Sequence, residues 1–274
     1  MATELDNELS QEERHKQNLE RLAKLRPIDD DFMRELFRNN LPLAQLVLRI
    51  ITKKDDLILK EQETQYDMKR LLDARSICLD VLATDSEGRK YNLEIQRSSK
   101  GAAPKRARYH SSAMDIEFLK IGQDFDDLPI TYIIFITEND VRKKGRPIYS
   151  FSRLDEETGE PFDDDEHIIF VNGAYRNEAD NSDLAKLIHD FKCSSADEMY
   201  IEPLAEKTRY CKEDPKGVSE MCKIMEDMVI EEKCRDAVRL LRTGKLSVED
   251  IADALKLPLE TIKELAEKYK DKTA

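Results

Sequence analysis

The sequence predicts an α/β protein with an all-helical C-terminal extension. Residues 75–96 have the pattern of a β-hairpin, with β-rich and alternating segments around a polar turn. The near-continuous apolar run 129–137 is typical of a strand buried on both faces, and residues 104–121 before it have helical spacing. Beyond Asp180 the pattern is helical throughout. Together these features predict a mixed sheet flanked by helices, followed by helices alone.

The first quarter of the chain predicts two amphipathic helices. Residues 1–24 are polar and charged, and we expect a frayed N-terminal arm there. An acidic run opens a helix over 29–37, and Pro42 fits the first turn of a second helix. A short apolar stretch, 57–59, is followed by polar residues to which no element is assigned.

The middle of the chain predicts a crossover between parallel strands. The hairpin consists of residues 75–84 and 91–96 around the turn 85–88. A helix that joins its second strand to the buried strand makes a βαβ unit. Shorter strands are expected at 147–151 and, as an edge strand, at 167–171.

The C-terminal third predicts a long helix over 217–241 and two short helices around Pro258. The short helices have the spacing of a small helix-turn-helix unit. The second of them carries acidic and basic residues together, a poor electrostatic match to DNA, so packing or oligomerisation is the favoured role. The expected domains are a charged arm (1–24), an α/β domain (25–178), a helical extension (179–241) and the helix-turn-helix-like segment (242–274).

Composition limits the cellular setting. No apolar run approaches the roughly 20 residues of a membrane-spanning helix, and residues 1–24 lack an apolar signal-peptide core, so no membrane association is expected. Five cysteines are scattered without a C-x-x-C pair. We therefore expect reduced thiols in a cytoplasmic protein, with neither a disulfide framework nor a zinc site.

The formal net charge of −13 argues against a surface coated in basic residues for non-specific nucleic-acid binding. It does not exclude a local basic groove. Basic residues gather between Arg97 and His110 and again in the run Arg142-Lys-Lys-Gly-Arg146.

The hairpin contains the candidate metal-binding residues. Asp80 stands among apolar residues, where an unpaired charge is costly. The midpoint between Asp80 and Glu94 is residue 87, inside the turn, so a simple register places the two carboxylates opposite each other. Facing carboxylates repel unless a cation or a shared proton lies between them, and Mg²⁺ or Mn²⁺ prefers such oxygen ligands. The alternative is that Asp80 points to solvent and Glu94 pairs with Arg75 or Arg97.

The ordered set of motifs resembles the PD-(D/E)XK nuclease superfamily, in its transposase-associated, recombination-promoting branch. The resemblance covers roughly residues 25–235. The segments that carry it are Leu79-Asp80, Glu94-Ile95-Gln96, Arg106-Ala-Arg-Tyr-His-Ser, Leu128–Thr137, Val171-Asn-Gly-Ala-Tyr175, Leu187-Ile-His-Asp-Phe191 and Met221-Cys-Lys-Ile-Met225.

The resemblance implies a restriction-endonuclease-like core in αβββαβ order, with a mixed four-stranded sheet, that hydrolyses the DNA backbone with a divalent ion. Asp80 and Glu94 would hold the ion, the Ile95 carbonyl would complete its shell, and Gln96 would lie beside the attacking water. Gln96 replaces the motif lysine, as it does throughout this branch. An amide can orient water but cannot carry positive charge.

Two further groups of residues complete the expected site. Asp29 is the preferred upstream acid that would join the metal, with Asp31 and Glu35 as competitors, and a helix-capping role for this acidic cluster is equally open. The candidates for phosphate contact, or for charge support of the site, are Lys105, Arg106, Arg108, Tyr109 and His110. A solvated basic face is the alternative for this second group.

The resemblance therefore implies a metal-dependent DNA endonuclease. The expected partners are DNA and a second copy of the chain in a homo-oligomer. The alternative is a weak or inactive nuclease fold that binds DNA or protein.

Overall fold

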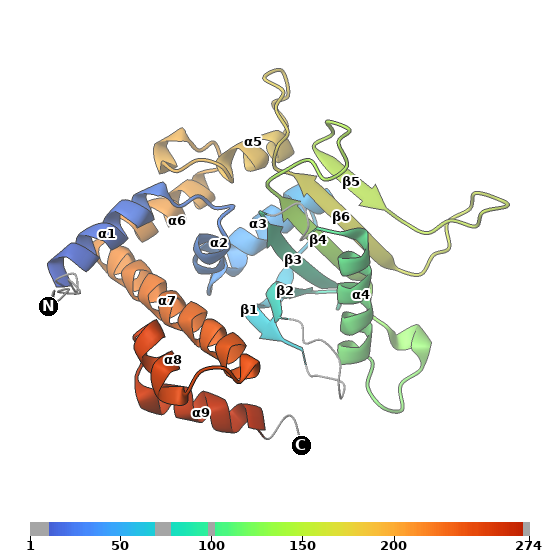
Figure 1. Cartoon of the computed structure of the whole chain (residues 1–274). Coiled ribbons are helices and arrows are strands. Elements are labelled where there is room, and N and C mark those ends of the chain that lie inside the picture. The colour runs from blue at the N-terminus through green and yellow to red at the C-terminus, as the bar shows by residue number, and fades with distance from the viewer. Residues whose placement is uncertain (1–10, 69–77, 98–101, 271–274) are drawn as a thin grey trace, which may run out of the picture. The chain divides into compact units, whose positions relative to one another are not determined.

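The computed structural model describes residues 11–68, 78–97 and 102–270 (Figure 1). The chain divides into two compact units, one of Ala23–Glu213 and one that joins the segment up to Leu22 with Asp214 onward. The four domains expected from the sequence stay a prediction. Within the described ranges, no helix has the length and apolarity needed to cross a membrane.

The strands all belong to the first unit: β1 (Leu59–Asp67), β2 (Cys78–Asp85), β3 (Lys90–Gln96), β4 (Thr131–Thr137), β5 (Ile148–Phe151) and β6 (Glu166–Asn172). Its helices are α2 (Asp30–Phe37), α3 (Leu41–Thr52), α4 (Pro104–Phe118), α5 (Asp183–Asp190) and α6 (Glu202–Glu213), with short 3₁₀ turns η1 (Phe125–Asp127) and η2 (Ala196–Glu198). The second unit contains α1 (Gln11–Lys24), α7 (Pro215–Thr243), α8 (Val248–Leu255) and α9 (Leu259–Lys270).

The sheet is mixed, and its strands lie in the order β1-β2-β3-β4-β6-β5. β1, β2 and β3 are antiparallel neighbours, β3, β4 and β6 are parallel, and β5 closes the far edge antiparallel to β6. The predicted α/β class and the β3-α4-β4 crossover are confirmed. The edge position expected for residues 167–171 is wrong, because β5 pairs outside β6. β1, for which residues 59–67 show no strand pattern although the implied αβββαβ order includes a strand before the hairpin, is an edge strand with mostly exposed polar side chains.

The hairpin has the predicted register. Val81 pairs with Leu93 and Thr84 with Lys90, so the next pair outward is Asp80 with Glu94. The turn closes at Gly88, whose φ of +84° favours glycine. The position of the turn therefore determines which carboxylates meet.

Helices cover both faces of the sheet (Figure 1). α4 packs on one face, where Ala107 and Met114 meet Leu82, Ile133 and Phe135 in a buried core. α2 and α3 lie on the other face. β4, which is buried along its whole length, lies in the middle of the sheet, as its apolar run predicted.

The second unit is helical. α8 and α9 pack on the C-terminal part of α7 through Ala237, Ile251, Leu257 and Ile262. Ser247 opens α8 with a capping box completed by Asp250. Residues 11–24 are a regular helix and not a frayed arm, because Leu22 is buried and Asn18 donates a hydrogen bond to Glu226 on α7.

Candidate active site

The two hairpin carboxylates meet near the ends of β2 and β3, as their register predicts. The backbone N–H of Asp80 donates to Glu94 Oε1 at 3.3 Å, and the N–H of Ile95 donates to Asp80 Oδ2 at 3.0 Å. Each carboxylate is thus held by the backbone of the opposite strand. The side chains are 13% and 1% exposed, respectively.

Burial disfavours the ionised forms of both carboxylates. Burial is the largest cause that raises the pKa of Asp80 above its ordinary value, and the Ile95 N–H and Arg34 oppose it. Burial, followed by the charge of Asp80, raises the pKa of Glu94 to about 8. Two carboxylates whose ionised forms are disfavoured side by side are suited to a bound cation.

Arg106, in the first turn of α4, reaches both the motif glutamate and the motif glutamine. Its Nη2 lies 3.4 Å from Glu94 Oε2, and its Nη1 donates to Gln96 Oε1 at 3.3 Å. Helix α4 enters directly after the hairpin, which places its first turn over these side chains. A fixed positive charge therefore lies beside the residue that replaces the motif lysine.

His110, one turn further along α4, is buried beneath this contact. Arg106 Nε donates to His110 Nε2 at 3.2 Å. Nδ1 of the same ring lies 3.1 Å from the amide nitrogen of Asn92 and 3.6 Å from Glu94 Oε1. Asn92, Glu94 and Gln96 thus share the face toward α4.

Arg34 is a site residue that the sequence reasoning missed. From α2, its Nη2 lies 3.6 Å from Asp80 Oδ1. Only acidic residues of this helix had been considered, and the contact between α2 and β2 is tertiary. Arg34 is the one basic residue in the helical sequence Asp30–Phe37, and this is the feature of the sequence that could have identified it.

The upstream acids make other pairs. Asp29 binds Arg26, with Nη2 to Oδ1 at 3.0 Å, and Arg97 at 3.3 Å. Its side chain makes no capping hydrogen bond to α2. Glu35 pairs with Arg38 and Lys207. The side chain of Asp31, with Arg75, lies outside the described residues.

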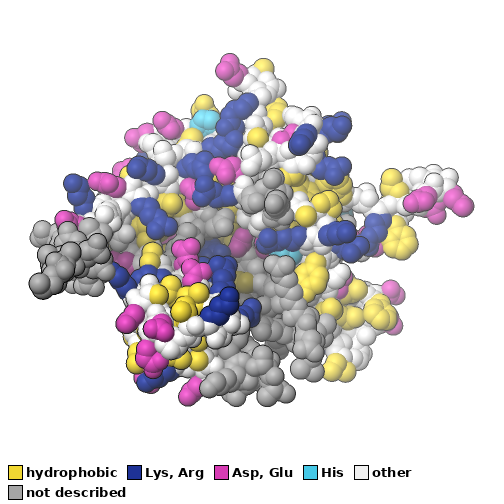
Figure 2. All heavy atoms as spheres, in the orientation of Figure 1, with side chains coloured by type: hydrophobic (Ala, Val, Ile, Leu, Met, Phe, Trp, Pro, Cys, Tyr) yellow, Lys and Arg dark blue, Asp and Glu magenta, His cyan; other side chains and the backbone are white. Residues whose placement is uncertain are grey.

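Exposed basic side chains surround the carboxyl end of β3. Lys105, Arg108 and Tyr109 are exposed on α4, whereas His110 is buried. Figure 2 shows Lys and Arg gathered near the end of β3 and the start of α4, while acidic residues mark the projecting loops of this unit.

A second basic group, the loop 142–146, follows β4. Because β3 and β4 are parallel and Gln96 pairs with Thr137, this loop leaves the same edge of the sheet as the site. Asp140 accepts hydrogen bonds from the N–H groups of Arg142, Lys143 and Gly145, and from the hydroxyl of Tyr149. The loop backbone is thus tied down while its cationic side chains are exposed.

The comparison with known families agrees with this geometry. The family model described as PD-(D/E)XK nuclease family transposase matches residues 37–229, well over half of the chain. The chain belongs to this family. Its sheet and flanking helices are the restriction-endonuclease-like fold of PD-(D/E)XK proteins. No curated protein and no solved structure matches the chain significantly.

Family membership supports a nuclease or phosphodiesterase-type enzyme with a DNA substrate, and PD-(D/E)XK nucleases use divalent metal ions. The donor set here fits such an ion. Glu94 is buried and Asp80 is partly buried, on adjacent strands, and the Ile95 carbonyl lies in the same strand segment. Hard oxygen donors of this kind suit Mg²⁺ or Mn²⁺. The match starts at Phe37, so Asp29 and Arg34 precede it.

Proposed function

We propose that this chain is a DNA endonuclease that depends on Mg²⁺ or Mn²⁺. The observation that carries the proposal is the pairing of Asp80 with Glu94, a partly buried and a buried carboxylate fixed by the backbone of opposite strands. Asp80, Glu94 and the Ile95 carbonyl would hold the ion. Such an ion activates a water for attack on the phosphodiester and screens the charge that develops there.

In this proposal Gln96 and Arg106 together perform the roles of the motif lysine. The Gln96 amide orients the attacking water by hydrogen bonding but cannot supply charge. The Arg106 guanidinium, within 3.3 Å of Gln96 Oε1 and 3.4 Å of Glu94 Oε2, supplies a permanent charge beside it. Asn92 and His110 hold Arg106 and Glu94 in place from below.

Arg34 acts on the other carboxylate. Together with Arg106 it offsets the negative charge that the carboxylate pair carries. The planar forks of both guanidinium groups are suited to contact with a scissile phosphate.

DNA would approach along the carboxyl edge of β3 and β4. Lys105, Arg108 and Tyr109 on α4 and the loop 142–146 present exposed polar or cationic groups on that side. These groups suit backbone contacts, which position the duplex without reading its sequence. We place Asp29 at the outer end of this edge. Its carboxylate pairs with Arg97, the residue that directly follows Gln96.

The test is nicking of supercoiled plasmid with Mg²⁺ or Mn²⁺. Asp80→Asn and Glu94→Gln should each lower the rate by ~100-fold or more, because the ion contributes several kcal/mol of transition-state stabilisation. The matched control is Asp115→Asn, a half-buried carboxylate on α4 whose surroundings are Glu166, Arg153 and Asp164.

Retention of nicking in both site variants would overturn the assignment. A wild type without nicking that still binds DNA or protein in a salt-sensitive complex would favour the second function, a binding module built on the nuclease fold.

A further inference from the structure

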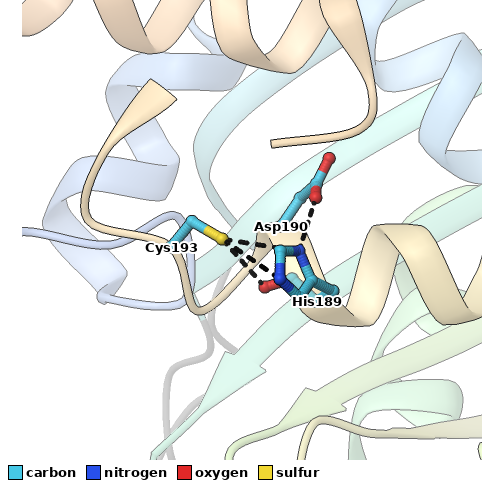
Figure 3. A group of neighbouring side chains, drawn as sticks. All are labelled: His189, Asp190 and Cys193. Carbon is cyan, nitrogen blue, oxygen red and sulfur yellow. Dashed lines mark hydrogen bonds and ion pairs between the residues drawn. The ribbon is translucent and has the colours of Figure 1, made fainter. Parts of the chain in front are cut away.

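Three metal-binding side chains meet at the end of α5, away from the hairpin carboxylates. His189 and Asp190 end the helix, and Cys193 follows one turn later (Figure 3). His189 Nδ1 lies 3.0 Å from Asp190 Oδ1 and 3.5 Å from Cys193 Sγ. One donor atom from each residue lies within 4.8 Å of the other two.

Asp190 Oδ1 and Cys193 Sγ both approach the same ring nitrogen of His189, Nδ1. With the ring proton on Nδ1 and directed to Asp190, the thiol donates to the His189 carbonyl at 3.5 Å and lies 3.9 Å from Nε2. A cation bound to all three side chains would replace these proton-mediated contacts.

The spacing suits a borderline-soft metal. Bond lengths of ~2.0–2.1 Å to nitrogen or oxygen and ~2.3 Å to sulfur place neighbouring ligands of a tetrahedral Zn²⁺ about 3.3–3.6 Å apart. The two separations from His189 Nδ1, 3.0 and 3.5 Å, are close to these values, and the three ligand atoms all lie within 4.8 Å of one another. A thiolate, a carboxylate and a neutral imidazole carry two negative charges in total, which a divalent ion neutralises, and sulfur and imidazole favour zinc over magnesium.

The cluster is held from behind and open in front. Asp190 is fully buried, and its oxygens also accept from the N–H groups of Tyr200 and Ile201 at 2.7–3.0 Å. Such outer hydrogen bonds fix the orientation of a ligand. Cys193 is buried, whereas the His189 side chain is 44% exposed and gives a path from solvent.

We propose that His189, Asp190 and Cys193 form a structural Zn²⁺ site with its fourth position open to water. Binding replaces the thiol proton: Zn²⁺ and the Cys193 thiol give a zinc thiolate and one released H⁺, while the His189 ring proton moves to Nε2. The ion would tie the end of α5 to the segment that leads through η2 into α6, and would add to the contacts that Asp190, His189 and Cys193 already make with that segment.

The experiment uses the full chain with Asp80→Asn and Glu94→Gln, so that the proposed nuclease site cannot bind the probe. After chelator treatment and desalting, Co²⁺ is titrated and thiolate-to-cobalt absorption is followed. We expect one equivalent to produce the band, and one equivalent of Zn²⁺ to abolish it and raise Tm by several degrees, with no effect of Mg²⁺.

Two variants locate the site. His189→Gln changes a partly exposed side chain and should fold, and both it and Cys193→Ser should lose the band and the Tm shift. Cys222→Ser, at another buried cysteine, is the matched control and should keep both. Absence of cobalt absorption, or a band that survives both His189→Gln and Cys193→Ser, overturns the proposal. Neither readout involves DNA cleavage, so failure here leaves the proposed nuclease site untouched.

Discussion

At the level of single residues, the central feature is a pair of buried carboxylates beside two guanidinium groups. The meeting of Asp80 and Glu94 was predictable, because a hairpin with a known turn has only one simple register. The cations were harder to predict. Arg106 was expected at the site for phosphate contact, yet its bonds to Glu94 and Gln96 depend on how α4 packs, and Arg34 comes from an element distant in sequence.

The burial of Glu94 predicts a pH-dependent stability in metal-free protein. Its pKa is about 8 in the folded chain and ~4.3 when unfolded, so between these values the folded state binds more protons. The free energy of unfolding should therefore fall as pH rises from about 5 to 8, by up to ~1.4 kcal/mol per pH unit.

Denaturant unfolding in chelator at several pH values measures this slope. Glu94→Gln should flatten it, and Glu63→Gln, an exposed carboxylate on β1, should not. An identical slope in wild type and Glu94→Gln would contradict the assignment of this pH dependence to Glu94.

The division of roles between Gln96 and Arg106 predicts a rescue. Arg106→Gln should lower kcat for nicking by ~100-fold, comparable to the loss of one preorganised electrostatic group. Adding Gln96→Lys should recover at least tenfold of that loss, about 1.4 kcal/mol, because a lysine returns the charge from the neighbouring strand position.

Arg108→Gln is the matched control, an exposed arginine on the same helix that should change KM and leave kcat nearly intact. If Gln96→Lys fails to rescue Arg106→Gln while both variants fold, the role of Arg106 is structural and not electrostatic.

At the level of elements, the strands with strong patterns were predicted and the weakly patterned one was not. β4 is buried on both faces and has a continuous apolar run, whereas β1 exposes most of its polar side chains at the sheet edge. The position of β6 inside the sheet also escaped prediction, since the sequence does not show that β5 pairs outside it. Local pattern identifies a strand but not its neighbours.

A close backbone approach behind the site predicts sensitivity at Gly173. Its N–H donates to the Thr137 carbonyl at 2.7 Å, and a Cβ there would lie 2.4 Å from that oxygen. Gly173→Ala should cost about 1–3 kcal/mol, because a backbone atom of the buried β4 must shift. Thr137 pairs with Gln96, so the nicking rate should fall as well.

Thermal unfolding and nicking assays on Gly173→Ala test this point. Ala174→Ser, at the neighbouring exposed residue, is the control and should match wild type in both. A Gly173→Ala protein with unchanged Tm would show that the strand ends can separate without cost.

At the level of the whole molecule, a net charge of −13 is compatible with a DNA enzyme because the charge is unevenly distributed. Exposed acids lie on the projecting loops of the sheet unit, while exposed Lys and Arg gather at the carboxyl edge of β3 and β4 (Figure 2). We therefore expect weak DNA binding without metal at physiological salt, with a steep salt dependence.

Charge reversal at the edge tests this distribution. Lys143→Glu with Lys144→Glu should weaken DNA binding and reduce the salt slope by about one to two, as expected when that many phosphate contacts are lost. Lys263→Glu with Lys268→Glu on α9 changes the net charge equally and is the control. Equal losses in the two double variants would mean that net charge, and not the edge, governs binding.

The most direct measurement is a Mn²⁺ titration of wild type and Asp80→Asn, with plasmid nicking and thermal unfolding followed in the same samples. We expect saturable nicking and a rising Tm in the wild type, and the loss of both in Asp80→Asn at Mn²⁺ concentrations that saturate the wild type. A folded Asp80→Asn protein that nicks DNA with the same Mn²⁺ dependence as the wild type would contradict the metal site at Asp80 and Glu94.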